Sequence, residues 1–240
     1  MAELNGGVFG KLSGSIGEIT FRRKNGKTFI CQRTKSFVPG HDQESANRRS
    51  RFSLAGKLAR AINSIPELKA FWQQITPKGK SPFNIMVQKN IRNVNPGSVS
   101  ETTTITPEFG FAINCTSSSI SKDAITVELA ALGSATGIDA GNEPIVKLDY
   151  VLSLTNPTNA SLPGVLFITG TSDAKPLAIV EDPASGNSPL TFILTLSEQN
   201  AASIGNYADR KLLLALVTLD MSCKPVRYSG TVVSQPSITL

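Results

Sequence analysis

The sequence predicts an α+β chain that is mostly β: an N-terminal β-hairpin and two or three helices, followed by a C-terminal antiparallel β-sandwich of the immunoglobulin-like kind. Three observations predict this fold. An Asn-Gly turn joins two β-prone runs near the N-terminus, and apolar residues recur at helical steps between residues 46 and 94. After Gly97 the chain is rich in Ser, Thr, Val, Leu and Ile, with turn residues at short intervals. The predicted segments are an arm over 1–17, a basic hairpin-plus-helices domain over 18–97 and the sandwich over 98–240.

The first segment is rich in glycine, which favours a flexible arm that can cross onto a neighbouring molecule. Its candidate anchors are its apolar residues, Val8, Phe9, Leu12 and Ile16. After the arm, Asn25-Gly26 separates the β-prone runs 19–23 and 27–33. This dipeptide is the strongest short-range signal for a β-hairpin.

Two or three helices are predicted between the hairpin and residue 97. The repeating face of the first carries Ala46, Arg49, Phe52, Ala55, Leu58, Ala59 and Ile62. Asp42 or Ser45 could cap it. Ser64 and Glu67 resemble a capping box that opens a second, short helix, and Ser81 before a proline opens the third.

The rest of the chain predicts a series of strands separated by turn residues. Candidate strands cover 109–114, 124–132, 145–154, 164–170, 177–180, 190–196, 211–219 and 226–233. Within 145–154 alternate positions are apolar throughout, which predicts a sheet with one face in water. Both faces of 212–219 are apolar, which predicts a central strand in the core of the sandwich.

The sequence offers little for catalysis. It has one histidine, one tryptophan and three scattered cysteines, and its carboxylates do not cluster. Gly79-Lys80-Ser81 resembles the end of a phosphate-binding loop, but Gln74 stands where that motif requires its first glycine. We therefore expect a protein that is not an enzyme, with no catalytic residue, cofactor, metal or small-molecule substrate.

Charge is divided unevenly along the chain. Residues 1–100 hold 17 Lys and Arg against 5 Asp and Glu, whereas residues 101–240 hold 7 against 13. Opposite charges on two parts of a chain can steer contact between copies, or direct the basic part to nucleic acid or an acidic partner. A solvated basic surface is the third alternative. The candidate contact residues are Arg22, Arg23, Lys24, Lys27, Arg33, Lys35, Arg48, Arg49 and Arg51, interleaved with Phe21, Phe29 and Phe37.

Targeting signals are also missing from the sequence. The N-terminal residues lack a basic region followed by an apolar one, so we expect synthesis in the cytoplasm without a secretory signal peptide. No run approaches the length of apolar sequence that crosses a membrane, so we expect no membrane association. Virions or other assembled particles are the expected location.

One pattern resembles a known group of proteins. It consists of Gly10-Lys11-Leu12-Ser13-Gly14, Gly17, Asn25-Gly26-Lys27, Arg48-Arg49-Ser50-Arg51-Phe52, Trp72 and Ser81-Pro82-Phe83-Asn84. Over residues 7–95 the chain resembles uncharacterised proteins of Bacteroidota and their phages, and the remainder resembles β-sandwich domains in general. That family has no established activity, so the resemblance implies no catalytic residue. It implies association with phage or particle-like assemblies.

Two functions follow as hypotheses. The first is a non-enzymatic structural subunit of a homo-oligomeric virion, tail or filament, in which the arm and basic domain join copies and the sandwich is exposed. The alternative is a nucleic-acid-binding or packaging protein that uses the basic hairpin and helix, whose binding would weaken with salt and with alanine at Arg22, Arg23 and Lys24.

Overall fold

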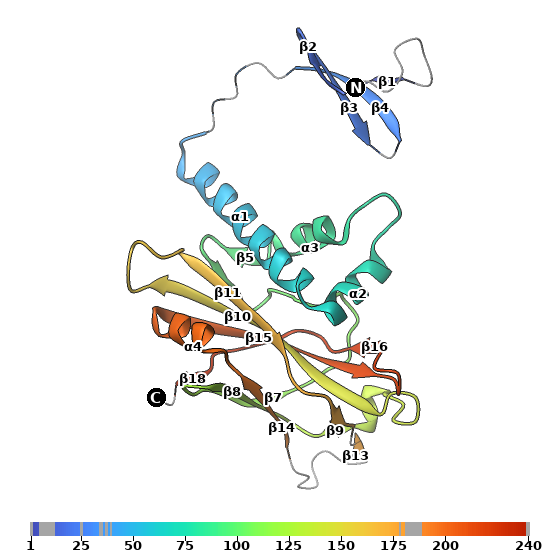
Figure 1. Ribbon diagram of the computed structural model, residues 1–240, viewed down its shortest axis with the longest axis vertical. Helices are drawn as coiled ribbons and strands as arrows, with labels where there is room; N and C mark the ends of the chain where they lie inside the picture. Colours follow the sequence, from blue (N-terminus) through green and yellow to red (C-terminus); the bar gives the residue numbers. More distant parts are fainter. Residues whose placement is uncertain are drawn as a thin grey trace. The chain divides into compact units, whose positions relative to one another are not determined.

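The computed structural model describes residues 2–4, 13–24, 26–33, 36, 38, 40–177, 179–180 and 189–238 (Figure 1). These residues form an α+β fold with more strand than helix, which confirms the predicted fold class. The chain divides into two compact units, Met1–Ala46 and Asn47–Leu240.

The first unit is a four-stranded antiparallel sheet with the order β1-β4-β3-β2. Its strands are β1 (Ala2–Leu4), β2 (Gly14–Ile16), β3 (Ile19–Lys24) and β4 (Lys27–Gln32). Strands β3 and β4 are the predicted hairpin, and Gly26 in their turn has a φ of 82°. Strands β1 and β2 lie within residues 1–17, so this segment contributes both edges of a sheet rather than only a flexible arm.

A second tight turn brings β2 alongside β3. Gly17 and Glu18 alone connect β2 to β3, and Gly17 has a φ of 58°. Two-residue turns with positive φ match the twist of paired strands, and glycine adopts this conformation without steric cost. The glycine-rich sequence predicts a flexible arm at Gly17, whereas the structure shows that a turn requires this glycine.

Three helices follow the first sheet, namely α1 (Gln43–Asn63), α2 (Pro66–Ile75) and α3 (Pro82–Asn90). Asp42 caps α1, because its carboxylate accepts a hydrogen bond from the amide of Ser45 at 2.8 Å. Ser81 caps α3 in the same way, accepting from the amide of Asn84 at 3.3 Å. Both caps satisfy an amide that has no partner inside the helix.

The start of α2 differs from its predicted capping box. The hydroxyl of Ser64 donates to the carbonyl of Ala61 at 2.7 Å, which ends α1 rather than starting α2. Ile65 occupies the cap position without a side-chain hydrogen bond. The helix still begins as expected, because Pro66 fixes a helical φ at its first residue.

Two sheets form the body of the second unit (Figure 1). The larger contains β10 (Ile145–Pro157), β11 (Val165–Thr171), β12 (Lys175–Pro176), β15 (Tyr207–Leu219), β16 (Pro225–Tyr228) and β17 (Val232–Ser234). The smaller contains β7 (Cys115–Ile120), β8 (Ala124–Leu129), β14 (Leu190–Thr195) and β18 (Ser237–Ile238). Shorter elements are β5 (Val94–Asn95), β6 (Ser98–Val99), β9 (Leu132–Gly133), the 3-10 turn η1 (Ser134–Thr136), β13 (Ile179–Val180) and α4 (Glu198–Gly205).

The connections follow an immunoglobulin-like plan. Strands β7 and β8 pair in the smaller sheet, and β10 and β11 pair in the larger. The chain then returns to the smaller sheet with β14 beside β8, and through α4 to the larger sheet with β15 beside β10. These pairs correspond to the B–E and C–F pairs of immunoglobulin-like domains.

Two hydrophobic cores lie on opposite faces of the larger sheet. Between the sheets, Leu148, Leu152 and Leu214 pack against Ile125 and Phe192 of the smaller sheet. On the other face the helices pack, with a core of Leu54, Leu58, Ile62, Leu68, Phe71, Trp72, Met86, Val151, Leu213 and Val217, among others. The unit therefore has three layers, of helices, a central sheet and a second sheet, as Figure 1 shows.

This layering corrects the prediction that β10 lies in a sheet with one face in water. Val146 and Leu148 face the second sheet, whereas Lys147, Asp149 and Val151 lie on the face that the helices cover. The alternation was interpreted as a wet face because two of its residues are charged. By contrast, β15 is the predicted central strand, apolar on both faces and paired on both sides.

The predicted boundary between residues 97 and 98 does not separate the two compact units. Helices α2 and α3 belong to the same unit as the sandwich, because their apolar faces share a core with β10 and β15. The indole of Trp72, for example, donates to the carbonyl of Ile105 at 2.9 Å. The change of composition near Gly97 therefore marks a change of secondary structure and not a domain boundary.

Candidate functional site

The sheet of the first unit has two chemically different faces. Residues paired directly across antiparallel strands share a face. One face therefore carries Ile16, Ile19 and Phe21, with Ile30 opposite Phe21. The other carries Ser15, Thr20, Arg22, Lys27, Phe29 and Cys31. The first face, called the apolar face below, thus holds most of the apolar residues together with Arg23, Thr28 and Gln32, and the second face is mainly polar and basic.

The described residues of the apolar face differ in exposure. Ile16 is 67% exposed and Ile19 46% exposed. Of the side chains described in strands β2 to β4, Thr28 is buried, and the two hydrophobic cores include none of them. A small sheet needs a partner layer on its apolar face for stability.

The nine predicted basic contact residues do not form one cluster. Arg22 and Lys27 lie on the basic face, but Arg23 lies on the apolar face. The exposed Arg33 follows β4. Arg48, Arg49 and Arg51 are exposed on α1, which belongs mainly to the second unit. The side chain of Lys24 and the whole of Lys35 lie outside the described part of the chain, as do the predicted anchors Val8, Phe9 and Leu12.

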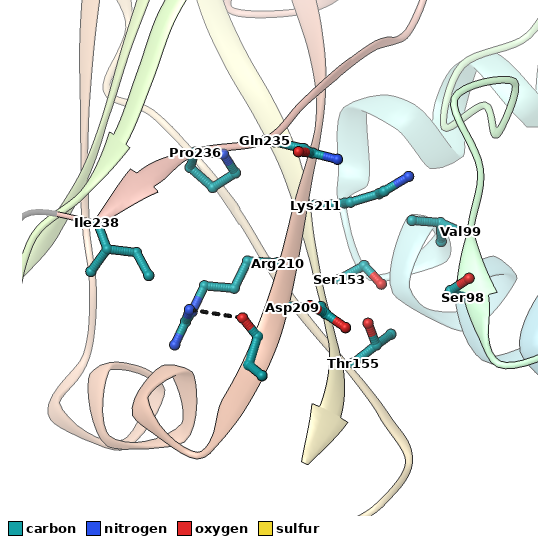
Figure 2. A pocket seen from close by; sticks show the side chains of 11 residues that line it. Ser98, Val99, Ser153, Thr155, Asp209, Arg210, Lys211, Gln235, Pro236 and Ile238 are labelled. Carbon is teal, nitrogen blue, oxygen red and sulfur yellow. Dashed lines mark hydrogen bonds between the residues drawn. The ribbon is translucent and has the colours of Figure 1, made fainter. Parts of the chain in front are cut away.

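A polar pocket of about 350 Å³ lies at one end of the central sheet, on the face that further along packs under the helices. Ser153 of β10 stands directly opposite Lys211 of β15, and Thr155 stands opposite Asp209. Strand β6 and the segment around Pro236 complete the lining. Figure 2 shows the oxygen-bearing ends of Ser153, Thr155 and Asp209 gathered on the side of Ser98 and Val99, with Arg210 extending to the opposite side.

Three groups of this pocket lack partners among the described residues, namely the hydroxyl of Ser153, the carboxylate of Asp209 and the buried Nε of Arg210. Ser153 is 1% exposed, and its hydroxyl makes no hydrogen bond. A buried hydroxyl without a partner costs roughly 1–3 kcal/mol. Asp209 is exposed at the rim, and none of the described residues pairs with its carboxylate.

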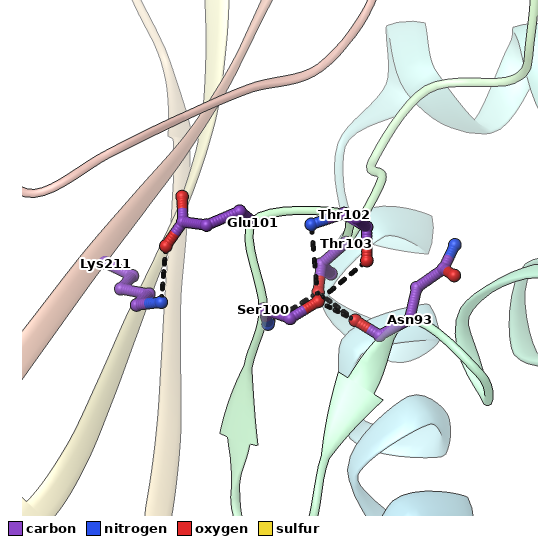
Figure 3. Close-up of polar contacts among 6 residues, drawn as sticks. All are labelled: Asn93, Ser100, Glu101, Thr102, Thr103 and Lys211. Atoms are coloured by element: carbon purple, nitrogen blue, oxygen red, sulfur yellow. Dashed lines mark hydrogen bonds and ion pairs between the residues drawn. The ribbon is translucent and has the colours of Figure 1, made fainter.

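The two basic residues of the pocket both donate hydrogen bonds, although the Nε of Arg210 makes none. Lys211 donates to Glu101 at 2.6 Å, and Figure 3 shows how the loop that carries Glu101 is held. The hydroxyls of Ser100 and Thr103 both donate to the carbonyl of Asn93, at 2.5 and 2.6 Å. Arg210 donates to the carbonyls of Ala208 and Ile204, at 3.2 and 3.0 Å.

A buried carboxyl lies beneath α2. Asp149 of β10 is 0% exposed, and neither of its oxygens completes a hydrogen bond. Burial raises the pKa of Asp149 from 3.8 to about 7, and Glu67 adds to the rise, while Thr171 and Lys147 oppose it. Lys147 is itself bound to Glu67 at 2.8 Å, with both side chains mostly buried. Because Asp149 is fully buried in the folded chain, its ionisation affects stability.

An apolar groove of about 600 Å³ lies between α1 and α3 and is lined by Phe52, Phe83, Val87 and Ile91. Phe52 was predicted on the buried face of the first helix, yet it is 62% exposed. It lies two turns before the buried Ala59 on the same stripe, where it borders the groove instead of being covered. The groove is a further exposed apolar feature of the described residues.

In comparisons with known proteins, no protein-family model matches the chain, and no curated protein matches it. Within the described residues, no group of His, Cys, Asp and Glu side chains could hold a metal ion. None of the described helices is long and apolar enough to cross a membrane.

Sequence reasoning missed the polar pocket and Asp149. A signal existed, because the apolar pattern of both central strands changes to polar residues at Ser153 and at Lys211. These two residues lie opposite each other because of the register in which β10 pairs with β15. That register brings together residues far apart in the chain, and no local pattern specifies it.

Proposed function

We propose that the chain is a non-enzymatic subunit of a homo-oligomeric assembly, in which the N-terminal sheet joins copies and the immunoglobulin-like sandwich is exposed. The observation that carries this proposal is the exposure of Ile16 and Ile19 on one face of the sheet. Burying such a face against a neighbouring copy removes apolar surface from water, which is the main source of association energy.

The edges of the same sheet support the proposal. Strands β1 and β2 are its outer strands, and each is three residues long. An outer strand presents unpaired amide and carbonyl groups that a strand from another copy can pair with. The resemblance of residues 7–95 to proteins of Bacteroidota and their phages is the reason to propose a virion, tail or filament as the assembly.

Two adjacent positions of β2 give a matched test. Ile16→Glu places a charge on the apolar face, and Ser15→Glu places the same charge on the opposite face. We expect Ile16→Glu to reduce the particle mass in light scattering to that of one chain, 25.5 kDa, because a carboxylate is costly to bury. Ser15→Glu should assemble like the wild type. Assembly by both variants, or a monomeric wild type, would overturn the proposal.

The second candidate function is binding of nucleic acid by the basic face. Arg22 is directly opposite Phe29 on this face, so positive charge and an aromatic ring adjoin. Alanine at Arg22 and Lys27 should reduce the slope of log affinity against log salt by about two. Arg23→Ala is the control, because it removes a positive charge from the other face of the same strand. It distinguishes binding by the basic face from a general effect of the net charge. Equal slopes for all three proteins would exclude this function.

A further inference from the structure

We propose that the polar pocket at the end of β10 and β15 binds a primary ammonium group carried on an aliphatic chain. This site is independent of the N-terminal sheet and goes beyond the proposed assembly. It also departs from our expectation that the chain has no small-molecule ligand. The argument rests on the acceptors, the charges and the apolar wall of the pocket.

The acceptors of the pocket suit an ammonium group. An ammonium has three donors and no acceptor. The pocket offers the carboxylate of Asp209 and the hydroxyls of Ser153 and Thr155 on one side, as Figure 2 shows. Ser153 is the deepest of the three, and its buried hydroxyl makes no hydrogen bond. A donor that reaches this depth restores the missing bond.

The placement of the charges also favours a cation on the side of the pocket that holds Asp209. The ammonium of Lys211 is bound to Glu101 at 2.6 Å, so this pair is neutral as a whole. The guanidinium of Arg210 points to the α4 side and donates to carbonyl groups there. Arg210 keeps its positive charge, because carbonyl groups do not neutralise it and its buried Nε makes no hydrogen bond. The carboxylate of Asp209, however, is the charge on the side of Ser153 and Thr155, where it attracts a cation and repels an anion.

The remaining lining suits an aliphatic stem. Val99, Pro236 and Ile238 present apolar surface beside the acceptors, and the pocket, at about 350 Å³, has room for several carbon atoms. The pocket thus matches an alkylammonium ion better than a polyol, which would leave the apolar wall unused. Both a free amine and the lysine side chain of another copy have this chemistry.

Isothermal titration of the full chain with n-butylammonium chloride tests the proposal. We expect saturable binding that becomes at least about tenfold weaker in Asp209→Asn, because a charge-assisted hydrogen bond is lost. Ser153→Ala should also weaken binding. Asp173→Asn, which removes an exposed carboxylate elsewhere, is the matched control and should bind like the wild type.

Three results would overturn the proposal: no saturable binding of n-butylammonium, equal binding by Asp209→Asn and the wild type, or saturation by inorganic phosphate or glucose instead. Light scattering of Asp209→Asn then distinguishes the two sources of the ammonium group, a free amine and a lysine side chain of another copy. A loss of assembled mass identifies a lysine of another copy as the ligand, and an unchanged mass identifies a free amine. A wild type that binds the amine without assembling would contradict the proposed function but not this site.

Discussion

The two main sheets of the chain differ in what covers their apolar faces. The central sheet of the second unit has apolar residues on both faces of β15, and each face contributes to a hydrophobic core. The sheet of the first unit has an apolar face with Ile16 exposed at 67%. Both arise from β-prone sequence of similar character, so the difference lies in the layers around them. Apolar residues buried within the chain stabilise its fold, whereas exposed apolar residues on one sheet face favour association with a partner.

The largest expected effect is in the completed core. Phe71 of α2 is 1% exposed, and its ring centroid lies 4.6 Å from that of Tyr228. Phe71→Ala should lower the free energy of unfolding by about 3–5 kcal/mol, because it leaves a cavity between the helices and the sheet. Urea denaturation followed by the fluorescence of Trp72, the sole tryptophan of the chain, measures this loss. A loss below about 1 kcal/mol would show that the helical layer is not part of the core.

The second effect is a dependence of stability on pH, which arises because the helices cover the central sheet and bury Asp149. The pKa of Asp149 is about 7 in the folded chain and 3.8 ordinarily, so between these values the folded state holds a proton that the unfolded state has released. Stability should therefore fall as the pH rises from about 4 to about 7, by up to about 4 kcal/mol, and change no further above.

Asp149→Asn separates this contribution from other titrations. The variant removes the ionisable group, so the fall in stability between pH 4 and pH 7 should become much smaller. Urea midpoints for both proteins at pH 5 and pH 8 provide the comparison. A wild-type chain that is more stable at pH 8 than at pH 5, by the same margin as the variant, would contradict the assignment.

The smallest effect on unfolding sharpens the comparison. Phe21→Ala makes the same change as Phe71→Ala, but in the N-terminal sheet, where Phe21 is half-buried and belongs to neither core. Because Trp72 lies in the second unit, the free energy of unfolding that its fluorescence reports should change by less than about 0.5 kcal/mol. Assembly measured by light scattering should weaken instead. A large shift of the Trp72 transition would mean that the two units unfold together.

Local signals predicted much of the fold. The turn at Gly26 joins the predicted hairpin, and the helices begin near the predicted positions. The Gly17 turn was missed, because a glycine-rich segment predicts flexibility and a tight turn equally well. The predicted basic cluster was a group in sequence only, since alternation along β3 places Arg22 and Arg23 on opposite faces of the sheet.

The sequence by itself determined the elements of this protein: its hairpin, its helices and the doubly apolar strand at its centre. These depend on residues a few positions apart, where backbone propensity and periodicity act. Tertiary structure alone decided that helices cover β10, that Asp149 loses its contact with water, and that Ser153 and Asp209 line one pocket. Burial and pairing depend on elements distant in the chain, so the chemistry they create appears only when the layers come together.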